Sequence, residues 1–330
     1  MESLRVGNKL SSYSLQGDSE NIFEFLIVGA GLCGLSLGWI LAEHFPDLNI
    51  QLVEKSKSSG GRMATRRIDD LKFDHGAQFI KIVLESEKWV EIWNHAGVIN
   101  PFPDKSVTAV CGKSGLTQLA KVLAHRLSVK FNYKIKLLQR SKFGWTLLND
   151  QGETIHAKNV VLTCPLPQAL EILEHSELIF DPAMSEIKYA SALVILIEST
   201  EEVGTGRIYE ENKGDGIFSI CAQHSKDHSN RPHWTVVMSP EWSQTHYEWP
   251  EDQILAESVL LIKNLRPDIQ IQKMHLKKWK YSHPLQSWSK LFEKVESGLY
   301  LAGDAFGGPS LLGALRSSSE LGKYLKGGSS

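Results

Sequence analysis

The hydrophobic pattern of the first part of the chain predicts a strand, a tight turn, a helix and a second strand. Apolar residues at 25–28 run directly into the glycine-rich sequence 29–34, and a helix-compatible stretch at 35–45 follows. A second apolar run, Ile50–Val53, ends at Glu54. Continuous apolar runs of this length are typical of parallel strands that are buried on both faces. The segment therefore predicts two parallel strands joined by a helix.

The middle of the chain predicts a helix and then several strands. The apolar positions at 116–127 suit a helix, and the polar sequence 149–152 suits a hairpin turn. Two prolines within 164–167 are expected to stop the last strand. The predicted strands are 129–138, 145–148, 154–157 and 160–163, and a helix is expected at 168–174.

The composition of the chain changes after residue 174. Strand-like runs separated by polar loops, together with an amphipathic helix at 251–265, predict an antiparallel sheet with helices. The predicted strands are 192–197, 216–220, 234–238 and 273–283. Near the C-terminus an apolar strand ends in Gly303-Asp304, and residues 307–310 are expected to open a further helix with Pro309 in its first turn.

Composition and charge narrow the classes of protein. The 330 residues are 42% hydrophobic and 22% charged, with a formal net charge of −2, which gives no reason to expect a nucleic-acid or membrane partner. The four cysteines are far apart in sequence and form no metal-binding or redox pair, which favours a reducing, cytoplasmic location. Residues 1–22 are mostly polar, and we expect a loose tail there rather than a signal peptide.

The glycine pattern at 29–34 carries specific chemistry. Gly29, Gly31 and Gly34 allow a sharp turn, close approach of the backbone to a pyrophosphate, and tight packing of helix on strand. Free amides at the start of the helix then meet the phosphate charge. Glu54 stands where a carboxylate accepts hydrogen bonds from an adenosine ribose. NAD and FAD share this arrangement, so the choice between them depends on residues elsewhere.

Two further segments resemble the flavin amine oxidase superfamily. Gly60-Gly61-Arg62 follows the ribose acid, and Gly303-Asp304 ends a buried strand. The resemblance implies that Arg62 and the glycine amides hold the diphosphate, and that Asp304 binds the ribityl chain of FAD. A guanidinium suits this role because its planar fork binds phosphate oxygens in a bidentate manner. A dehydrogenase that uses only NAD is the poorer alternative, because NAD has no ribityl chain.

Within that superfamily the chain resembles renalase and renalase-like flavoproteins. Two departures lie near the expected substrate position: Phe79-Ile-Lys-Ile-Val83 replaces an aromatic residue followed by Thr-Ala-Arg, and Leu312-Gly313-Ala314 replaces Glu-Gly-Ala. Lys81 and Arg316 belong to these departures. The matching stretches are 60–67, 73–79, 111–116, 237–243, 279–281 and 303–308.

The resemblance implies an oxidase reaction. Its substrates would be the 2- and 6-dihydro isomers of NAD(P)H, which pass a hydride to flavin N5, and dioxygen would be the electron acceptor. Arg62, Arg66 and Arg67 would meet the substrate phosphates. Two alternatives stay open: a flavin amine oxidase or desaturase for a small apolar substrate, and a flavin-binding redox sensor without turnover.

The predicted site residues fall into two groups. Gln78, Trp279 and Tyr281 are the candidates for the catalytic pocket, whereas His75 is expected to be a structural hydrogen-bonding residue. The loop with His224, Asp227, His228 and His233 is expected to be solvated, and no metal site is predicted. The residues predicted to bind FAD, without a covalent link, are Gly29, Gly31, Leu32, Cys33, Gly34, Glu54, Lys55, Gly61, Arg62, Gln78, Ile135, Gly303, Asp304, Gly313 and Ala314.

These predictions combine into one fold class. We expect an α/β protein with a Rossmann-type FAD-binding domain that is built from separated segments, and an inserted α+β substrate domain with an antiparallel sheet. The FAD-binding domain is predicted at 23–79, 104–168 and 285–330, and the substrate domain at 80–103 and 169–284.

Overall fold

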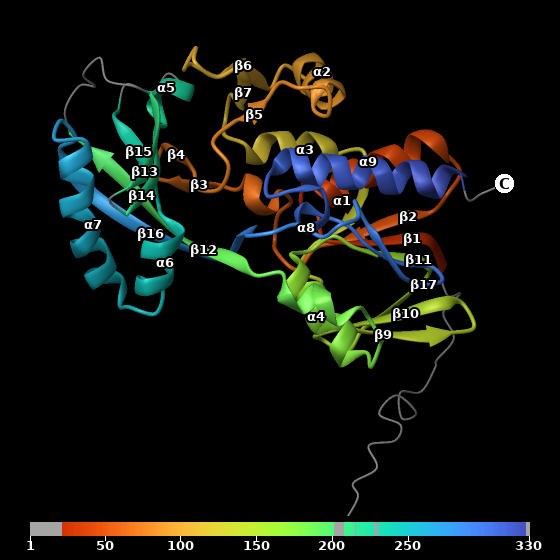
Figure 1. Ribbon diagram of the computed structural model, residues 1–330. Helices are drawn as coiled ribbons and strands as arrows, with labels where there is room; N and C mark the ends of the chain where they lie inside the picture. Colours follow the sequence, from red (N-terminus) through yellow and green to blue (C-terminus); the bar gives the residue numbers. More distant parts are fainter. Residues whose placement is uncertain (1–21, 201–207, 215, 228, 230, 328–330) are drawn as a thin grey trace, which may run out of the picture.

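The core of the fold is a sheet of eight strands with a parallel centre. The computed structural model describes residues 22–200, 208–214, 216–227, 229 and 231–327. β1 pairs in parallel with both β2 and β11, and the sheet extends from these strands to both edges (Figure 1). In sheet order the strands are β17 (Glu293–Glu296), β18 (Leu299–Leu301), β11 (Thr154–Leu162), β1 (Ile22–Val28), β2 (Ile50–Val53) and β8 (Ser128–Lys130), with β10 (Gly144–Asn149) and β9 (Ile135–Ser141) branching antiparallel from β11.

Strand β1 is apolar throughout its second half because both of its faces are covered. Phe25 and Ile27 belong to the core shared with the helices on one face, and Leu26 and Val28 belong to the core on the other. The first face is covered by α1 (Leu32–His44), α2 (Glu87–His95), α3 (Thr117–Ala124) and α9 (Leu311–Gly327), and the second by α4 (Leu166–His175) with β9 and β10 (Figure 1).

A second sheet of five antiparallel strands lies beside the first. Alternate residues of its interior strand β12 point to opposite faces: Leu193 and Ile195 pack with α7 (Glu251–Leu265), whereas Ala192 and Val194 pack with β4 (Leu71–Asp74). In sheet order the strands are β13 (Tyr209–Gly214), β14 (Ile217–Ala222), β15 (His233–Met238), β12 (Tyr189–Ser199) and β16 (Ile271–Pro284), and the helices are α6 (Pro240–His246) and α7 (Glu251–Leu265). The two sheets confirm the predicted fold class.

Smaller elements connect the two large sheets. The hairpin of β3 (Thr65–Ile68) and β4 (Leu71–Asp74) packs through Leu71 and Phe73 on the antiparallel sheet. The other small elements are η1 (Gly61–Met63), η2 (Pro182–Glu186), α5 (His224–Asp227), α8 (Asp304–Gly307) and a three-stranded sheet of β5 (Ile80–Lys81), β7 (Ala109–Gly112) and β6 (Ile99–Pro101).

Three local predictions were wrong. The strands expected at 154–157 and 160–163 are one strand, β11, because its first half pairs with β10 while its second half continues between β1 and β18. The strand expected at 129–138 breaks after Lys130, because Asn132 adopts a positive φ of 54° and the next amide, that of Tyr133, donates to the carbonyl oxygen of Glu54. The last helix begins at Leu311, so Pro309 lies in the linker between α8 and α9 rather than in the helix.

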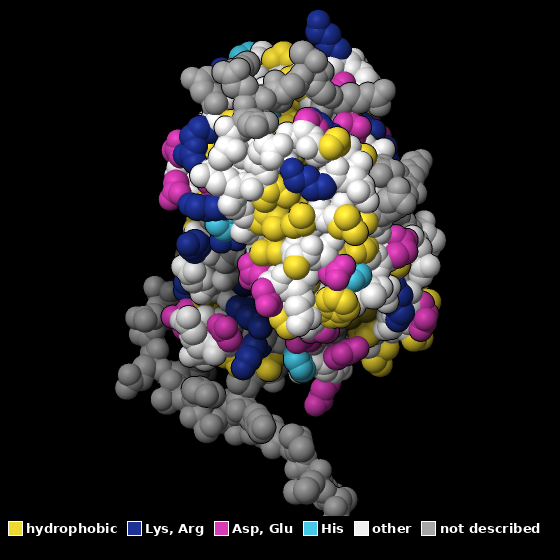
Figure 2. Space-filling view, turned by 90° about the vertical axis from the view of Figure 1, so that its left-hand side faces the viewer, with side chains coloured by type: hydrophobic (Ala, Val, Ile, Leu, Met, Phe, Trp, Pro, Cys, Tyr) yellow, Lys and Arg dark blue, Asp and Glu magenta, His cyan; other side chains and the backbone are white. Residues whose placement is uncertain are grey.

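Helix α2 packs against the parallel-sheet core. Trp89 and Trp93 are buried among residues of α1 and α3, although 80–103 was predicted to belong to the substrate domain. The division into domains therefore stays a prediction. Figure 2 shows the face that carries the antiparallel sheet, where hydrophobic side chains are surrounded by charges of both signs. Among the described residues, no helix is both long and apolar enough to span a bilayer.

Candidate functional site

A cavity of about 1130 Å³ lies where the parallel strands end and the antiparallel sheet begins. The residues that follow β1, β2, β11 and β18 all line it, as do β12 and β16 from the other sheet. Ligands of open parallel sheets bind beyond the carboxyl ends of the strands. The position of the cavity is therefore the one expected for a dinucleotide, and the second sheet supplies its far wall.

The turn between β1 and α1 separates the roles of its glycines. Gly29 has a φ of +114°, and a Cβ at Gly34 would lie 2.0 Å from the carbonyl oxygen of Gly29. A Cβ at Gly31 would meet nothing within 4 Å, and Gly31 lines the cavity. Gly34 thus allows the helix to pack on the turn, whereas Gly31 leaves open space in front of the first amides of α1. This space fits the diphosphate of a dinucleotide.

Glu54 is fixed by two main-chain amides. Its carboxylate oxygens accept hydrogen bonds from the amide of Ala30 at 2.9 Å and from the amide of Ser56 at 2.8 Å. An ionised carboxylate has about four acceptor positions, so about two remain for a ligand. These contacts hold the side chain at the cavity wall, and the remaining lone pairs suit the hydroxyls of a ribose.

The two charged residues that the resemblance assigned to neighbouring groups of the cofactor, the diphosphate and the ribityl chain, contact each other. Arg62 Nη2 donates to Asp304 Oδ1 at 2.8 Å, and Nη1 donates to Asp304 Oδ2 and to the carbonyl oxygen of Ser282. The hydroxyl of Tyr189 donates to Asp304 Oδ1 at 3.1 Å. Burial opposes the charge of Arg62, but Asp304 outweighs it, and the pKa of Arg62 is raised. Burial and the charge of Asp304 also raise the pKa of Tyr189.

Gln78 lines the cavity, but its amide is fully used by the protein. Nε2 donates to the carbonyl oxygens of Asp74 and Gly76 at 2.8 and 3.1 Å. Oε1 accepts from Gln223 Nε2 at 2.7 Å and from Lys226 Nζ at 3.3 Å. The side chain therefore shapes the wall more than it offers hydrogen bonds to a ligand, and its predicted catalytic role stays a prediction.

His75 and Trp279 form a stacked pair in the wall. Their ring centroids are 5.3 Å apart with an interplanar angle of 23°, and the indole nitrogen donates to the carbonyl oxygen of His75 at 2.7 Å. Among the described residues the His75 Nδ1 atom is buried without a hydrogen-bond partner, whereas the main chain of His75 is bonded to Ala64 and to Trp279, so the structural role of the ring stays a prediction. Burial, then the charge of Lys277, lowers the pKa of His75 to about 4. The imidazole is therefore neutral at pH 7.

Most of the predicted cofactor residues meet at this cavity, and a few do not. Gly34 and Gly313 do not line it; a Cβ at Gly313 would lie 1.9 Å from the carbonyl oxygen of Gly308, so this glycine serves packing. Arg66 and Arg67 are exposed and do not line it either. The predicted residues that do line it are Gly29, Gly31, Leu32, Cys33, Glu54, Lys55, Gly61, Arg62, Gln78, Ile135, Trp279, Tyr281, Gly303, Asp304 and Ala314.

The expectation of a solvated histidine loop was wrong for the residues that the structure describes. His224 and His233 are buried, His233 lies in β15, and Lys226 is buried in an ion pair with Asp74. His228 and the side chain of Asp227 lie outside the described residues. Polar composition suggested exposure, but tertiary partners bury these groups. Within the described part of the chain, no three His, Cys, Asp or Glu side chains cluster as a metal site would require.

Several lining residues were missed by sequence reasoning. Ser282 and His283 line the cavity beside the Arg62–Asp304 pair, and Lys277 and Lys280 flank Trp279. Tyr189 does not line the cavity itself, but its hydroxyl contacts Asp304 from behind the wall. Each stands in a strand without a distinctive motif, so no local pattern marks it. The alternation of β16 was the one available indication, because it places Lys277, Trp279 and Tyr281 on one face.

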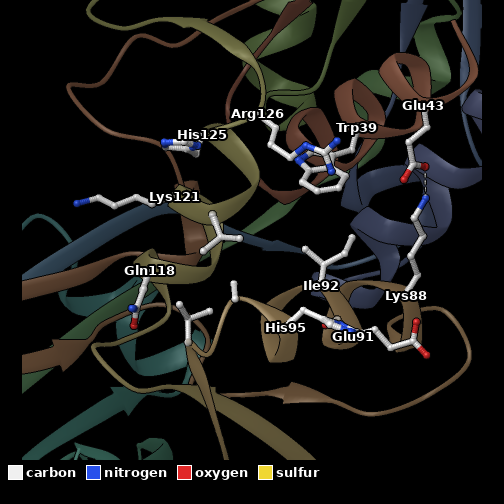
Figure 3. Close-up of a pocket in the computed structure, with 13 residues that line it drawn as sticks. Trp39, Glu43, Lys88, Glu91, Ile92, His95, Gln118, Lys121, His125 and Arg126 are labelled. Carbon is white, nitrogen blue, oxygen red and sulfur yellow. Dashed lines mark hydrogen bonds and ion pairs between the residues drawn. The ribbon is translucent and has the colours of Figure 1, made fainter. Parts of the chain in front are cut away.

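A second, shallower pocket of about 800 Å³ lies between α1, α2 and α3 (Figure 3). Trp39 and Ile92 give it an apolar floor, and the Arg126 guanidinium lies 4.4 Å from the Trp39 ring centre. Its rim carries both signs of charge, including the Lys88–Glu43 pair (Figure 3). It contains none of the predicted site residues, so the larger cavity is the candidate site.

Comparison with known proteins decides the family. The family model described as flavin containing amine oxidoreductase matches residues 92–318, more than half of the chain, and an NAD(P)-binding Rossmann-like domain model matches residues 27–96. The chain belongs to the flavin-containing amine oxidoreductase family. It is therefore an oxidoreductase of a flavin-dependent family, and the predicted FAD agrees with that membership.

Solved structures share the fold of this flavin amine oxidoreductase. Wild-type putrescine oxidase bound to putrescine aligns with a TM-score of 0.70 at 12% identity, covering 92% of this chain and 99% of that chain. A CLA-producing fatty acid isomerase from P. acnes aligns with a TM-score of 0.69 at 11% identity, covering 92% of this chain and 98% of that chain. Thiamine thiazole synthase of Aspergillus oryzae is 55% identical over 38 residues, which is 12% of this chain and 12% of that enzyme.

Proposed function

We propose that this flavin amine oxidoreductase is an FAD-dependent oxidase for anionic dihydronicotinamide nucleotides, namely the 2- and 6-dihydro isomers of NAD(P)H, with dioxygen as the electron acceptor. Bound FAD supplies the acceptor for a hydride and returns the electrons to dioxygen. The residues of the chain hold the cofactor, orient the substrate and exclude water.

The observation that carries the proposal is the charge of the cavity wall around Trp279, which we call the substrate wall. Lys277 and Lys280 on β16 line the cavity on either side of Trp279, and Lys81 at the end of β5 lines it as well. The carboxylates among the described lining residues are Glu54, Glu171 and Asp304, which follow β2, lie on α4 and follow β18, all on the parallel-sheet side. The substrate wall is therefore cationic and aromatic, which suits a flat ring attached to phosphates.

The same charges oppose a cationic amine. Two like charges about 5 Å apart at an effective dielectric constant of about 20 repel by up to about 3 kcal/mol. That is a loss of about a hundredfold in affinity for each lysine that close to a bound ammonium. Solvent screening reduces the effect for the exposed Lys280, but Lys277 is half-buried.

The cavity also offers a water-poor environment. Phe79 and Tyr209 line it and form an aromatic cluster with Phe102, with ring centroids 4.7 to 6.0 Å apart. Exclusion of water favours hydride transfer and strengthens electrostatic contacts. The chain thus has a wall that shields the reacting atoms and a separate charged wall that selects the substrate.

We also propose that the FAD is held without a covalent link. Cys33 and Cys164 line the cavity and are free thiols. Burial raises the pKa of Cys164 to about 12, and burial with the charge of Asp304 raises the pKa of Cys33. Thiols are nucleophilic only as thiolates, so neither is activated for attachment to the flavin. Denaturation in acid should release all of the flavin into solution.

The test is anaerobic mixing of the purified yellow protein with the dihydronicotinamide isomers. We expect fast bleaching of the flavin band, reversed by air. Lys277→Glu should raise the KM for the phosphate-bearing nucleotides at least tenfold and leave the KM for the phosphate-free dihydronicotinamide riboside nearly unchanged. Lys273→Glu, an exposed position on the same strand that does not line the cavity, is the matched control.

Oxidation of a small amine is the second candidate. It is favoured by the amine oxidoreductase family match and by the aromatic pair of Tyr281 and Tyr189, whose rings are 5.9 Å apart. If an amine reduces the flavin rapidly and neither dihydronicotinamide isomer does, the nucleotide proposal fails and this candidate replaces it.

A further inference from the structure

A buried ion pair joins the antiparallel sheet to the wall of the cavity. Lys226 lies in α5, directly after β14, and its Nζ atom is 2.7 Å from Asp74 Oδ2 at the end of β4. The side chains are 4% and 1% exposed. The two residues are 152 positions apart in sequence. Burial opposes the Lys226 ammonium, but the charge of Asp74 outweighs it, and the pKa of Lys226 is raised.

The charged atoms of this pair are fully hydrogen-bonded. The ammonium also donates to the main-chain oxygen and to Oε1 of Gln78, both at 3.3 Å. Asp74 Oδ1 accepts from Thr65 Oγ1 at 2.6 Å and from the amide of Leu116 at 2.8 Å. Gln223, from the same connection as Lys226, accepts the amide of Asp74 and donates to Gln78. The three N–H groups of the ammonium therefore have three fixed acceptors.

The segment held by this network is itself bonded to the predicted diphosphate site. The amide of His75 donates to the carbonyl oxygen of Ala64 at 3.1 Å, and the amide of Ala77 donates to that of Arg62 at 3.0 Å. A Cβ at Gly76 would lie 2.0 Å from the carbonyl oxygen of Arg62, so the main chain at Gly76 and the main chain at Arg62 are in close contact. Arg62 and residues 75–78 all line the cavity. A displacement of segment 74–78 would therefore move both Arg62 and this part of the cavity wall.

We propose that Lys226 is a positioning residue for the cavity that receives FAD. Its side chain enters from α5, in the connection between β14 and β15, and fixes segment 74–78. Through the main chain of Arg62, that segment fixes the geometry of the cavity. The inference rests on the proposed FAD site.

Stability alone does not require charged residues at the positions of Lys226 and Asp74. Replacing a buried ion pair with apolar residues of similar volume is often neutral or stabilising, whereas removing one partner leaves a buried charge and costs several kcal/mol. What an apolar pair does not provide is direction. The ammonium has three fixed acceptors on one short segment, and these fix its orientation as well as its distance.

The test compares Lys226→Met/Asp74→Asn with wild type. The double variant leaves no unpaired charge, so it folds even if Lys226→Met alone does not. Lys263→Met is the matched control, because Lys263 lies on α7 and donates to the carbonyl oxygen of Ile269, away from the cavity. Three quantities are measured: hydrogen exchange of the peptides that contain His75 and Ala77, the Kd for FAD, and the visible spectrum of the bound flavin.

We expect the double variant to exchange these amides at least tenfold faster, to bind FAD at least tenfold more weakly and to show a shifted flavin spectrum, with the control unchanged. Faster exchange with wild-type FAD affinity and spectrum would overturn the inference, because the network would then be structural only. Wild-type exchange and wild-type FAD binding would overturn it as well. Failure of the proposed function is seen separately in the wild-type protein, as a bound flavin that neither dihydronicotinamide isomer reduces, and it leaves the comparison of FAD binding between the variants unaffected.

Discussion

Two glycines of the same turn allow the cofactor cradle to be tested apart from the fold. In Gly34→Ala the new Cβ would lie 2.0 Å from the Gly29 oxygen and 2.8 Å from Thr163 Oγ1. The nearer atom is backbone, so it must move by more than about 1 Å to reach an ordinary contact distance. Overpacking of this kind costs about 1–3 kcal/mol, and we expect the upper end because a main-chain atom has to move.

Gly31→Ala makes the same chemical change with a different result. Gly31 has a φ of −77°, which alanine adopts without strain, and its Cβ would meet nothing within 4 Å. The free energy of unfolding should stay within about 0.5 kcal/mol of wild type. The added methyl group, however, enters the space in front of the α1 amides, where we expect the diphosphate to bind. The Kd for FAD should rise at least tenfold.

The assay uses cofactor-stripped protein, because bound FAD would add its own stabilisation. Urea unfolding gives the free energy of unfolding of both variants, and titration with FAD gives the Kd. Gly34→Ala should lose stability and Gly31→Ala should lose affinity. The reasoning is refuted if Gly31→Ala binds FAD as tightly as wild type, or if Gly34→Ala is as stable as wild type.

Two other predictions follow from single contacts. Glu54→Gln leaves one carbonyl oxygen for the amides of Ala30 and Ser56, so the exposed amide of Ser56 loses its acceptor to water and the side chain is held less firmly. FAD should then bind more weakly by calorimetry, and an unchanged Kd would remove Glu54 from the site. The pKa of His75 is about 4 in the folded state and 6.5 in the unfolded state, so wild type should lose up to about 3 kcal/mol of its free energy of unfolding as the pH falls from 6.5 to 4. His75→Phe should lose this pH dependence of the free energy of unfolding, whereas His125→Gln, at an exposed position, should keep it. Equal pH dependence of the two variants in urea unfolding would contradict the prediction.

Where the sequence predicted correctly, the relevant interactions are local. The turn at 29–34, Glu54 after β2, and Gly303-Asp304 after β18 each lie within two residues of the end of a strand, so their place at the edge of the sheet depends mainly on that strand. Helix α7 begins and ends at the residues predicted, because its apolar face and the preceding Pro250 are both local features. The comparisons then confirmed the flavin-dependent family that these motifs indicated.

Tertiary structure decided the features that depend on partners distant in sequence. Lys226 looked solvated because its neighbours are polar, yet Asp74 draws it into the interior. Arg62 and Asp304 were assigned to separate parts of the cofactor, but they contact each other once β18 lies beside β11. Tyr189 and Lys277 had no motif at all. Local sequence patterns encode strands, turns and caps. Burial and charge pairing depend on which distant segments pack together, and for this chain only the folded structure shows which segments do so.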